Sequence, residues 1–275
     1  MESTHLRFSG IVPFDLEVYF AETHSLMEET HFDAHTHPFC EIYINLSGDI
    51  SFMVENHIYP IRAGSVILTR PNEFHHCIYN SFSDSHRHFC IQFSANGNER
   101  LLSRFYDRPI GTGNLIFLGT EALGEICAIC RTLASDTVSE LERFGRFFRL
   151  LSVLESSHDG SAAREEAPMY EDVRIALDHI SEHIASPLTV KELASVAHVS
   201  VNTLERHFLS AMNVTPSEFL KERRLALAKT LLREGRSVME AAEESGFSDY
   251  SHFIALFHRR FGITPLQYKR KKRNT

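Results

Sequence analysis

The sequence lacks any long apolar run: none approaches the ~18–20 residues that a helix needs to cross a bilayer. Its amino terminus has no basic stretch followed by an apolar core, so it does not read as a secretory signal. No glycine-rich phosphate loop, nucleotide fingerprint or Ser-His-Asp arrangement is present. These absences argue against a membrane or secreted protein, and they give no support to a nucleotide-dependent or hydrolytic enzyme.

Cysteine is also scarce, with five residues at positions that form no disulfide framework: Cys40, Cys77, Cys90, Cys127 and Cys130. An odd number without regular spacing favours reduced thiols and a cytoplasmic location. The Cys127-x-x-Cys130 pair lies on an apolar stretch, where burial is the more common explanation than redox or metal chemistry.

Lysine is missing from the first two thirds of the chain, since every lysine lies at or beyond Lys191. Residues 1–167 contain 12 Arg, no Lys and 23 Asp or Glu, whereas residues 168–275 contain 16 Lys or Arg and 13 acids. The net charge of −8 for all 275 residues hides this asymmetry. It suggests an acidic module joined to a second module that faces a polyanion.

The hydrophobic pattern changes its period along the chain. From about residue 11 to 93 short apolar runs alternate with polar positions, as in Glu41 to Leu46, which predicts an antiparallel barrel or sandwich. Residues 121–135 and 139–157 read as amphipathic helices. The apolar stripe of 139–157 is wider than one small barrel needs, so packing on its own domain and a dimer contact both stay open. Residues 158–168 have the composition of a linker.

The strongest pattern is an internal repeat at an offset of 49 residues. The matched positions are Leu204, Phe208, Val214, Thr215, Pro216 and Phe219 with Phe253, Phe257, Ile263, Thr264, Pro265 and Tyr268. Asn213 and Gly262 stand where a helix ends in a left-handed residue. Thr215 and Thr264 then serve as N-caps, each followed by proline and by Glu or Gln three residues on, which completes a capping box.

Each repeated helix is preceded by a shorter helix and a tight turn. Thr189-x-x-Glu192 opens the first short helix as a capping box, and Ser200 caps the helix that follows. The second short helix runs from about Ser237 to Gly246, and Asp249 caps its successor. This is the helix-turn-helix layout, and a long helix over 217–233 would present two recognition helices to successive major grooves, ~34 Å apart. A helical-repeat protein scaffold is the alternative.

Residues 170–270 resemble the AraC/XylS family of transcription regulators. The resemblance rests on the stretches TVKELASVAHVSVNTLERHF, RRLALAKTLL and EESGFSDYSHFIALFHRRFGITPLQY. It implies a one-component bacterial-type regulator, expected to be an activator, that binds double-stranded promoter DNA with both recognition helices.

Carried over by position, the resemblance places Asn202, Glu205 and Arg206 at base edges. Arginine can take guanine in a bidentate contact, asparagine prefers adenine and glutamate can accept from cytosine. Family members usually carry arginine where Ala255 stands, so the second helix should contribute less polar readout and more phosphate anchoring. The full set expected to contact DNA is Ser200, Asn202, Thr203, Glu205, Arg206, Ser251, His252, Ala255, His258, Arg259 and Arg260.

A second constellation, His35-x-His37-x3-Glu41, places three polar side chains of equal parity on one stretch. On a regular strand they would all face into the barrel. With His75 they match the ligand types of a first-row metal site. The arrangement resembles the cupin motif over about residues 30–80, with Glu29 in place of an expected glycine and one extra residue before Pro71.

Sensor domains of this regulator family often keep these positions without a metal, so a metal-free effector pocket is the preferred expectation and no cofactor is required. A divalent metal held by His35, His37, Glu41 and His75 is the alternative. The residues expected to line the effector site are His35, His37, Glu41, Tyr43, Arg70, His75 and His88, and His86 shares a strand face with His88. The resemblance favours a sugar or related metabolite as effector.

The sequence thus predicts an α+β chain: an N-terminal antiparallel, cupin-like β-barrel with flanking helices over 1–158, a linker over 159–168, and an all-α domain over 169–275 with two helix-turn-helix units joined by a long helix. The expected partners are promoter DNA, a small-molecule effector, RNA polymerase and a second copy bound through 139–157. Two alternatives are a metal-dependent cupin enzyme fused to a DNA-binding domain, and a regulator whose barrel only dimerises.

Overall fold

The computed structural model describes residues 16–24, 34–80, 85–95, 97–135, 137–157 and 169–273. The expected linker, 159–168, lies outside the described residues. The strands are β1 (Leu16–His24), β2 (Cys40–Ser47), β3 (Ile50–Val54), β4 (His57–Ile61), β5 (Ser65–Thr69), β6 (His75–Tyr79), β7 (Ser85–Phe93) and β8 (Leu115–Phe117). The barrel-side helices are η1 (Glu99–Leu101), α1 (Ser103–Tyr106), α2 (Thr120–Leu133) and α3 (Glu140–Ser156). In the C-terminal part lie α4 (Glu171–His183), α5 (Val190–Val196), α6 (Val201–Met212), α7 (Pro216–Arg233), α8 (Val238–Glu244), α9 (Tyr250–Phe261) and α10 (Pro265–Arg273).

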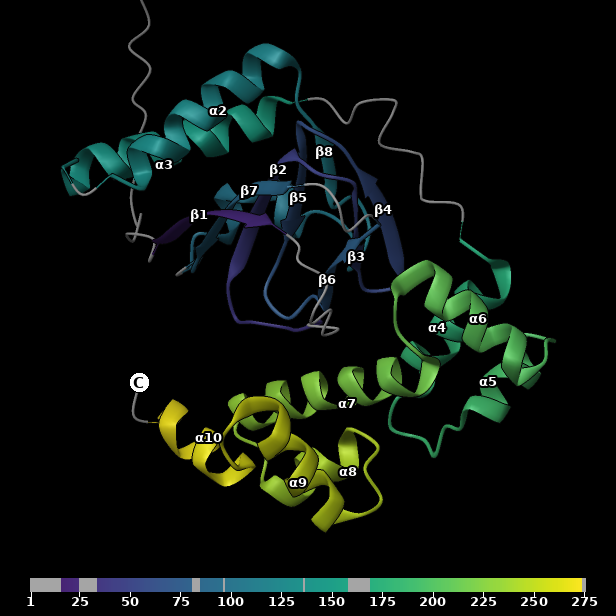
Figure 1. Ribbon diagram of the computed structural model, residues 1–275. Helices are drawn as coiled ribbons and strands as arrows, with labels where there is room; N and C mark the ends of the chain where they lie inside the picture. The colour runs from purple at the N-terminus through teal and green to yellow at the C-terminus, as the bar shows by residue number, and fades with distance from the viewer. Residues whose placement is uncertain are drawn as a thin grey trace, which may run out of the picture.

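The described strands form two antiparallel sheets, which confirms the antiparallel β-structure predicted for the N-terminal part (Figure 1). One sheet has the order β1-β7-β2-β5-β8 and the other β4-β3-β6. The two are hydrogen-bonded separately, so closure into a continuous barrel remains a prediction. Among the described helices none is both long and apolar enough to span a bilayer.

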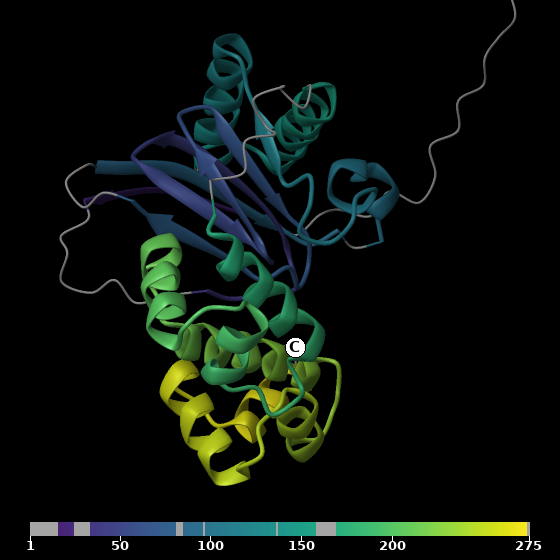
Figure 2. The same ribbon diagram turned by 90° about the vertical axis from the view of Figure 1, so that its right-hand side faces the viewer.

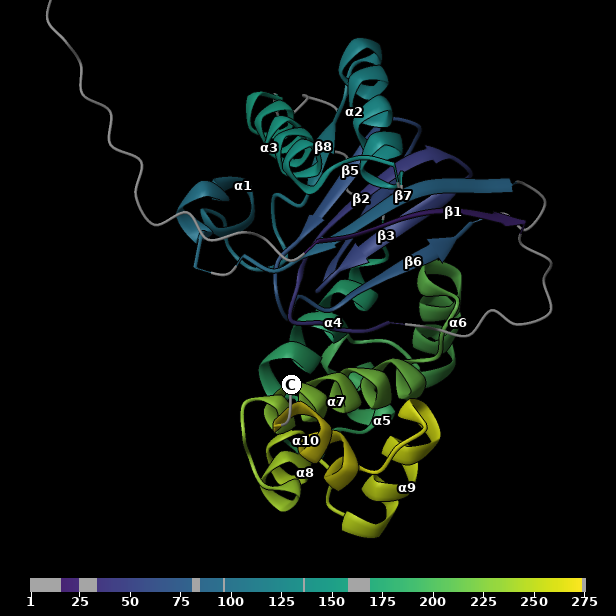
Figure 3. The same cartoon turned by 90° about the vertical axis from the view of Figure 1, so that its left-hand side faces the viewer.

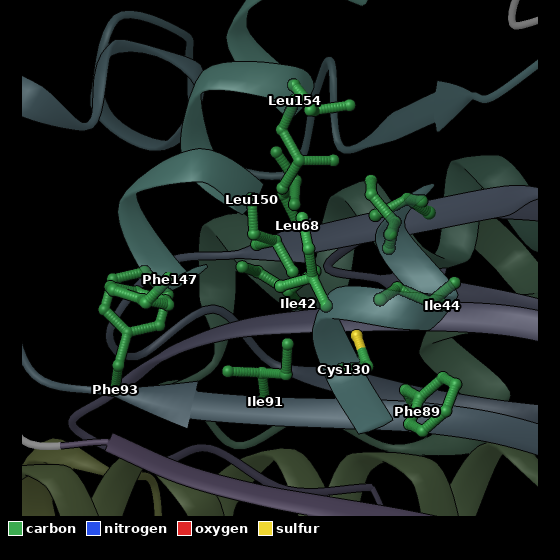
Figure 4. Packing of buried hydrophobic residues seen from close by; sticks show 14 of the residues in the cluster. Ile42, Ile44, Leu68, Phe89, Ile91, Phe93, Cys130, Phe147, Leu150 and Leu154 are labelled. Carbon is green, nitrogen blue, oxygen red and sulfur yellow. The ribbon is translucent and has the colours of Figure 1, made fainter. Parts of the chain in front are cut away.

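The two faces of β2 explain where the core lies. Ile42 and Ile44 are fully buried on the outer face, where they pack with residues of α2 and α3 (Figure 4). Tyr43 points the other way, between the sheets, and packs with Phe52. Because neighbouring side chains on a strand alternate, the outer face of this sheet is apolar and lies under two helices, whereas its inner face carries polar side chains beside a smaller apolar cluster that includes Tyr43 and Ile67.

Helix α3 buries most of its stripe against its own domain. Phe147, Leu150 and Leu154 lie in the cluster that covers the outer face of the sheet (Figure 4). Leu141 is 83% exposed at the start of the same helix, and Phe148 is 37% exposed. The described contacts therefore account for most of the stripe by packing within the domain, and the dimer contact remains a prediction.

The C-terminal helices follow the boundaries that the repeat predicts. The side chain of Ser200 caps α6, Asn213 ends it in the left-handed conformation, and Thr215 opens α7 with a complete capping box. Asp249 caps α9, and Gly262 ends it with φ of 71°. Thr189 departs in one respect: it accepts from the amide of Glu192, but that carboxylate lies 3.7 Å from His179 instead of returning to the cap.

The helical domain docks against one end of the two-sheet domain, with α7 lying beneath it (Figures 1 and 2). Helices α8, α9 and α10 lie on the far side of α7 (Figure 3). The ring of Phe74 packs on Phe219 of α7 at 5.9 Å between centroids, and Arg223 donates to Glu55 at 2.6 Å. Phe74 thus joins the core of the first helix-turn-helix unit.

Gly246 sets how closely the second helix-turn-helix unit approaches the end of α4. Its φ is +85°, and a Cβ there would run into the carbonyl oxygen of Ile184 and the guanidinium of Arg224. Arg224 itself donates to the carbonyls of Ile184 at 3.1 Å and Ser186 at 2.6 Å. Only glycine combines this backbone conformation with this contact.

We therefore expect Gly246→Ala to lower the free energy of unfolding by at least about 2 kcal/mol, because strain and a backbone clash add. Gly145→Ala is the matched control: Gly145 lies in α3 with no atom within 4 Å of an added Cβ. Chemical denaturation of both variants measures the difference. Equal stability of the two variants would contradict the packing described for Gly246.

Candidate DNA interface and barrel ligand site

The first recognition helix, α6, has one buried and one open face. Leu204, Phe208 and Met212 are fully buried in the core of the helical domain. Asn202 and Arg206 are exposed, and Glu205 is half-buried. A 3.6-residue period places these polar residues opposite the apolar stripe, so the residues expected to read bases point away from the core.

Ser200 and Thr203 act locally. The Ser200 hydroxyl accepts from the amide of Thr203 at 3.1 Å, and the two hydroxyls lie 2.8 Å apart. These bonds satisfy backbone donors at the start of α6. Both residues position the helix, and any contact they make with DNA is additional to that capping.

His207 is a residue of α6 that the sequence reasoning missed. Its Nδ1 lies 2.8 Å from an Asp172 carboxylate oxygen, and its ring stacks on Tyr170 with centroids 3.9 Å apart. Both partners lie at the beginning of α4, which follows the expected linker. No local sequence signal marks this pair, because its members are 35 positions apart. The contact fixes α6 relative to the start of the domain.

The second recognition helix, α9, presents a different surface. Phe253 and Phe257 are fully buried. The exposed residues are Ser251, His252, Ala255, His258 and Arg259. Arg260 differs from the expectation: its Nε donates to Glu222 of α7 at 2.8 Å, so its guanidinium faces the protein. We therefore leave Arg260 out of the phosphate-anchoring set.

The barrel histidines converge although His35 and His37 precede β2. His35 exchanges two backbone hydrogen bonds of 3.1 Å with His75 at the start of β6. His35, His37 and His75 can each offer one ligand nitrogen, and these three atoms lie within 4.8 Å of one another. Glu41 adds a carboxylate, with oxygens 3.1 Å from Nε2 of His37 and 3.8 Å from Nε2 of His75. The predicted four residues thus share one site.

The charge state of this cluster follows from burial and hydrogen bonds. Burial lowers the pKa of His75 to about 3, although nearby Glu41 opposes the shift, so the ring is neutral at pH 7. Burial alone would raise the pKa of Glu41, but hydrogen bonds from His37 and Gln92 hold it below its usual range. The cluster therefore combines a carboxylate with a neutral imidazole that can donate a lone pair.

A second polar group lies further along the inner face of the same sheet. The Tyr43 hydroxyl is 2.6 Å from Nε2 of His86, and the Tyr43 ring stacks on His88 at 4.6 Å. Asn45 is paired with His88 across β2 and β7 and is fully buried. Among the described residues, neither side-chain amide atom of Asn45 nor Nδ1 of His88 has a hydrogen-bond partner. Asn45 was not among the expected effector residues.

Arg70 does not join these groups. Its guanidinium donates to the carbonyls of Tyr106 at 3.5 Å and Arg108 at 3.3 Å. Arg108 in turn makes a two-pronged pair with Glu73 at 2.7 and 2.8 Å, and Glu73 is 2% exposed. Burial alone would raise the pKa of Glu73, but the Arg108 guanidinium lowers it below the usual value. This buried pair ties the turn after α1 to the loop before β6, and the charge of the Arg108 guanidinium is already balanced by Glu73.

Comparison with known proteins agrees with this two-part organisation. A family model described as an AraC-like ligand binding domain matches residues 22–171, which is more than half of the chain. A second model, described as a helix-turn-helix domain, matches residues 193–271.

Individual relatives are similar over most of the chain. The transcriptional activator RhaS of Shigella boydii is 27% identical over 254 residues, which cover 87% of this chain and 88% of that protein. The regulator YbfI of Bacillus subtilis is 26% identical over 229 residues, covering 80% and 81%. A crystal structure of an AraC-type DNA-binding protein from Chromobacterium violaceum is 28% identical, with a TM-score of 0.34, and covers 37% of this chain and 91% of that chain.

Proposed function

We propose that the two recognition helices of this chain have different roles in DNA binding. The chain belongs to the AraC/XylS family of transcription regulators. The family establishes that this is a DNA-binding regulator that responds to a small molecule. In our proposal α6 reads base edges through Asn202 and Arg206, whereas α9 anchors the phosphate backbone through His258 and Arg259. The supporting observation is the difference between the exposed residues of the two helices.

Base reading and phosphate anchoring have different signatures. A bidentate arginine–guanine contact discriminates against the wrong base by about 1–3 kcal/mol. A phosphate contact weakens all sequences equally when lost and lowers the salt dependence of binding. The helix α9 carries an alanine at position 255, where an arginine would be needed for a guanine contact.

We expect Arg206→Ala to weaken binding by about 1–3 kcal/mol and to relax specificity at one base position. Arg259→Ala should weaken binding uniformly and reduce the slope of log K against log salt by about 1. The test is a base-by-base affinity scan on a duplex selected from a random pool by the natural protein. A uniform loss for both variants would refute the division of labour.

We further propose that the effector is a neutral, hydroxyl-rich metabolite such as a sugar. A buried polar group without a partner costs about 1–3 kcal/mol, and Asn45 leaves a donor and an acceptor unused at full burial. Hydroxyl groups can satisfy both. An anionic effector is disfavoured because Arg70 and Arg108 are engaged with protein carbonyls and Glu73, while the nearby Glu41 carries negative charge.

Asn45→Leu should abolish the effector response while raising the stability of the empty protein by about 1–3 kcal/mol, since an unpaired amide is removed. The measurement is the shift in unfolding temperature with a panel of neutral monosaccharides and matched sugar acids. Arg70→Gln serves as control and should keep the response. A response only to the acids, lost in Arg70→Gln, would contradict a neutral effector.

A second candidate occupant of the barrel is a divalent cation. His35, His37, His75 and Glu41 are suitable ligands, and Nε2 of buried His75 has no hydrogen-bond partner among the described residues. With a cation bound, the site would still lack an evident reaction, and the relatives are named as regulators. A cation would therefore serve as part of the sensor.

The two candidates differ in what removal of metal does. We expect protein dialysed against EDTA to keep its full thermal response to the neutral sugar, because Asn45 and His88 need no cation. Elemental analysis before and after dialysis gives the metal content. One equivalent of metal before dialysis, together with loss of the response after it, would favour the cation-dependent sensor instead.

Three further expectations remain predictions. The homodimer through residues 139–157 has support only from the exposed Leu141 and Phe148 of α3. A contact with RNA polymerase, and with it the role of activator, is consistent with the name of the RhaS relative. A cytoplasmic location follows from a function on promoter DNA and agrees with five free cysteines.

A further inference from the structure

The extended segment 34–37 has two faces, and each face contacts a different domain. The rings of His35 and His37 lie beside His75, with centroids 4.5 and 4.8 Å away. Ala34 and Thr36, which alternate with the histidines, are 2% and 5% exposed. Because successive side chains of an extended chain point to opposite sides, the histidines face the barrel site, whereas Ala34 and Thr36 face the helical domain.

The face that carries Ala34 and Thr36 contacts both α7 and the second helix-turn-helix unit. The Thr36 hydroxyl is 3.4 Å from that of Thr230, and the Thr36 carbonyl accepts from Lys229 at 3.5 Å. The carbonyl of Ala34 accepts from Arg260 of α9 at 3.5 Å. These partners lie at the carboxyl end of α7 and in α9, so the segment holds the unit that α9 belongs to.

The chain that pairs with this segment is arranged in the same way. His75 faces the cluster, whereas the preceding Phe74 packs on Phe219 and lies 4.5 Å below the guanidinium of Arg223. Further back, the amide of Asn72 donates to the carbonyl of His37 at 2.9 Å, and the Asn72 side chain accepts from Arg233. Contacts to α7 thus extend from Phe219 to Arg233, along nearly its whole length.

We propose that segment 34–37 and its partner 72–75 form a coupling element that transmits the state of the barrel site to α7. A ligand that draws His35 and His37 inward must also move the carbonyls and the hydroxyl that hold α7 and α9. The inference rests on the proposed function only in taking the barrel as the effector site. By linkage, a change at either end alters the free energy of the other by the same amount.

The proposal identifies residues with no contact to ligand or to DNA that should control the response. Thr36, Lys229 and Thr230 face neither the histidine cluster nor the exposed surfaces of α6 and α9. Their role is positional: they set how firmly the second helix-turn-helix unit is held to the barrel. Their effect is therefore measurable without DNA and without the natural effector.

The test is hydrogen–deuterium exchange of the full chain with a matched pair of variants. His37→Gln removes a ring carried by the segment, whereas His57→Gln removes a ring of β4 that stacks on Tyr59, outside the segment and outside the effector site. His37→Gln should speed exchange in residues 227–233 and 257–261 by about fivefold or more. His57→Gln should leave both regions unchanged, with peptides from α2 and α3 reporting global stability.

A reversible lock supplies the second measurement. The double variant Thr36→Cys with Thr230→Cys replaces two hydroxyls that lie 3.4 Å apart. Because the two side chains are this close, we expect the new thiols to form a disulfide on oxidation. Oxidation should restore slow exchange to the His37→Gln protein, and reduction should remove it. Oxidised Thr36→Cys alone controls for the natural thiols.

Equal acceleration by both histidine variants, or unchanged exchange in α7 for a folded His37→Gln protein, would overturn the proposal. If His37→Gln unfolds the barrel, the lock in the natural background decides. It should then slow exchange in residues 34–40 and 72–76 by about fivefold, and no change there would overturn the coupling. Neither exchange measurement involves promoter DNA or the effector. A failure of the proposed function would therefore appear separately, in the binding experiments described above.

Discussion

The position of both recognition helices depends on the burial of α7 in two separate cores. Its first turns supply Phe219 and Leu220 to the core beneath α6, and its later turns supply Leu225, Ala228 and Leu232 to the core beneath α9. A helix of 18 residues spans about 27 Å. Because its ends are held by packing, α7 is a spacer of fixed length, and the distance between α6 and α9 follows from it.

In the two-sheet domain, the larger apolar cluster lies outside the five-stranded sheet, and polar side chains lie on its inner side. Its central sheet buries isoleucine, valine and phenylalanine on the outside, under α2 and α3. The inner face is then free to carry Glu41, Asn45 and several imidazoles, whose desolvation is only partly offset by hydrogen bonds among themselves. The larger apolar core thus lies on one face of β2, and the polar groups of the ligand site lie on the other, beside the smaller apolar cluster around Tyr43.

Much of the helical domain could be predicted because its signals are local. A cap, a proline, a left-handed stop and an apolar register occupy neighbouring positions, so Thr215 and Gly262 are recognisable from the sequence alone. Equal parity predicts that His35, His37 and Glu41 share one side of a regular strand, but the two histidines precede β2, and the backbone pairing of His35 with His75 brings them to the site. The pairing of Arg260 with Glu222, of His207 with Asp172 and of Arg223 with Glu55 could not be predicted, because each joins residues at least 35 positions apart. Docking between domains has no sequence signal of its own.

With α7 fixed in length, α6 and α9 of one chain should contact the same duplex at the same time. Hydroxyl-radical footprinting of the full chain on a duplex selected from a random pool measures both contacts in one experiment. We expect two protected segments on one face of the DNA, with centres about 10–10.5 base pairs apart for each chain, as the length of α7 requires. A single protected segment, or two segments whose spacing varies among selected duplexes, would contradict it.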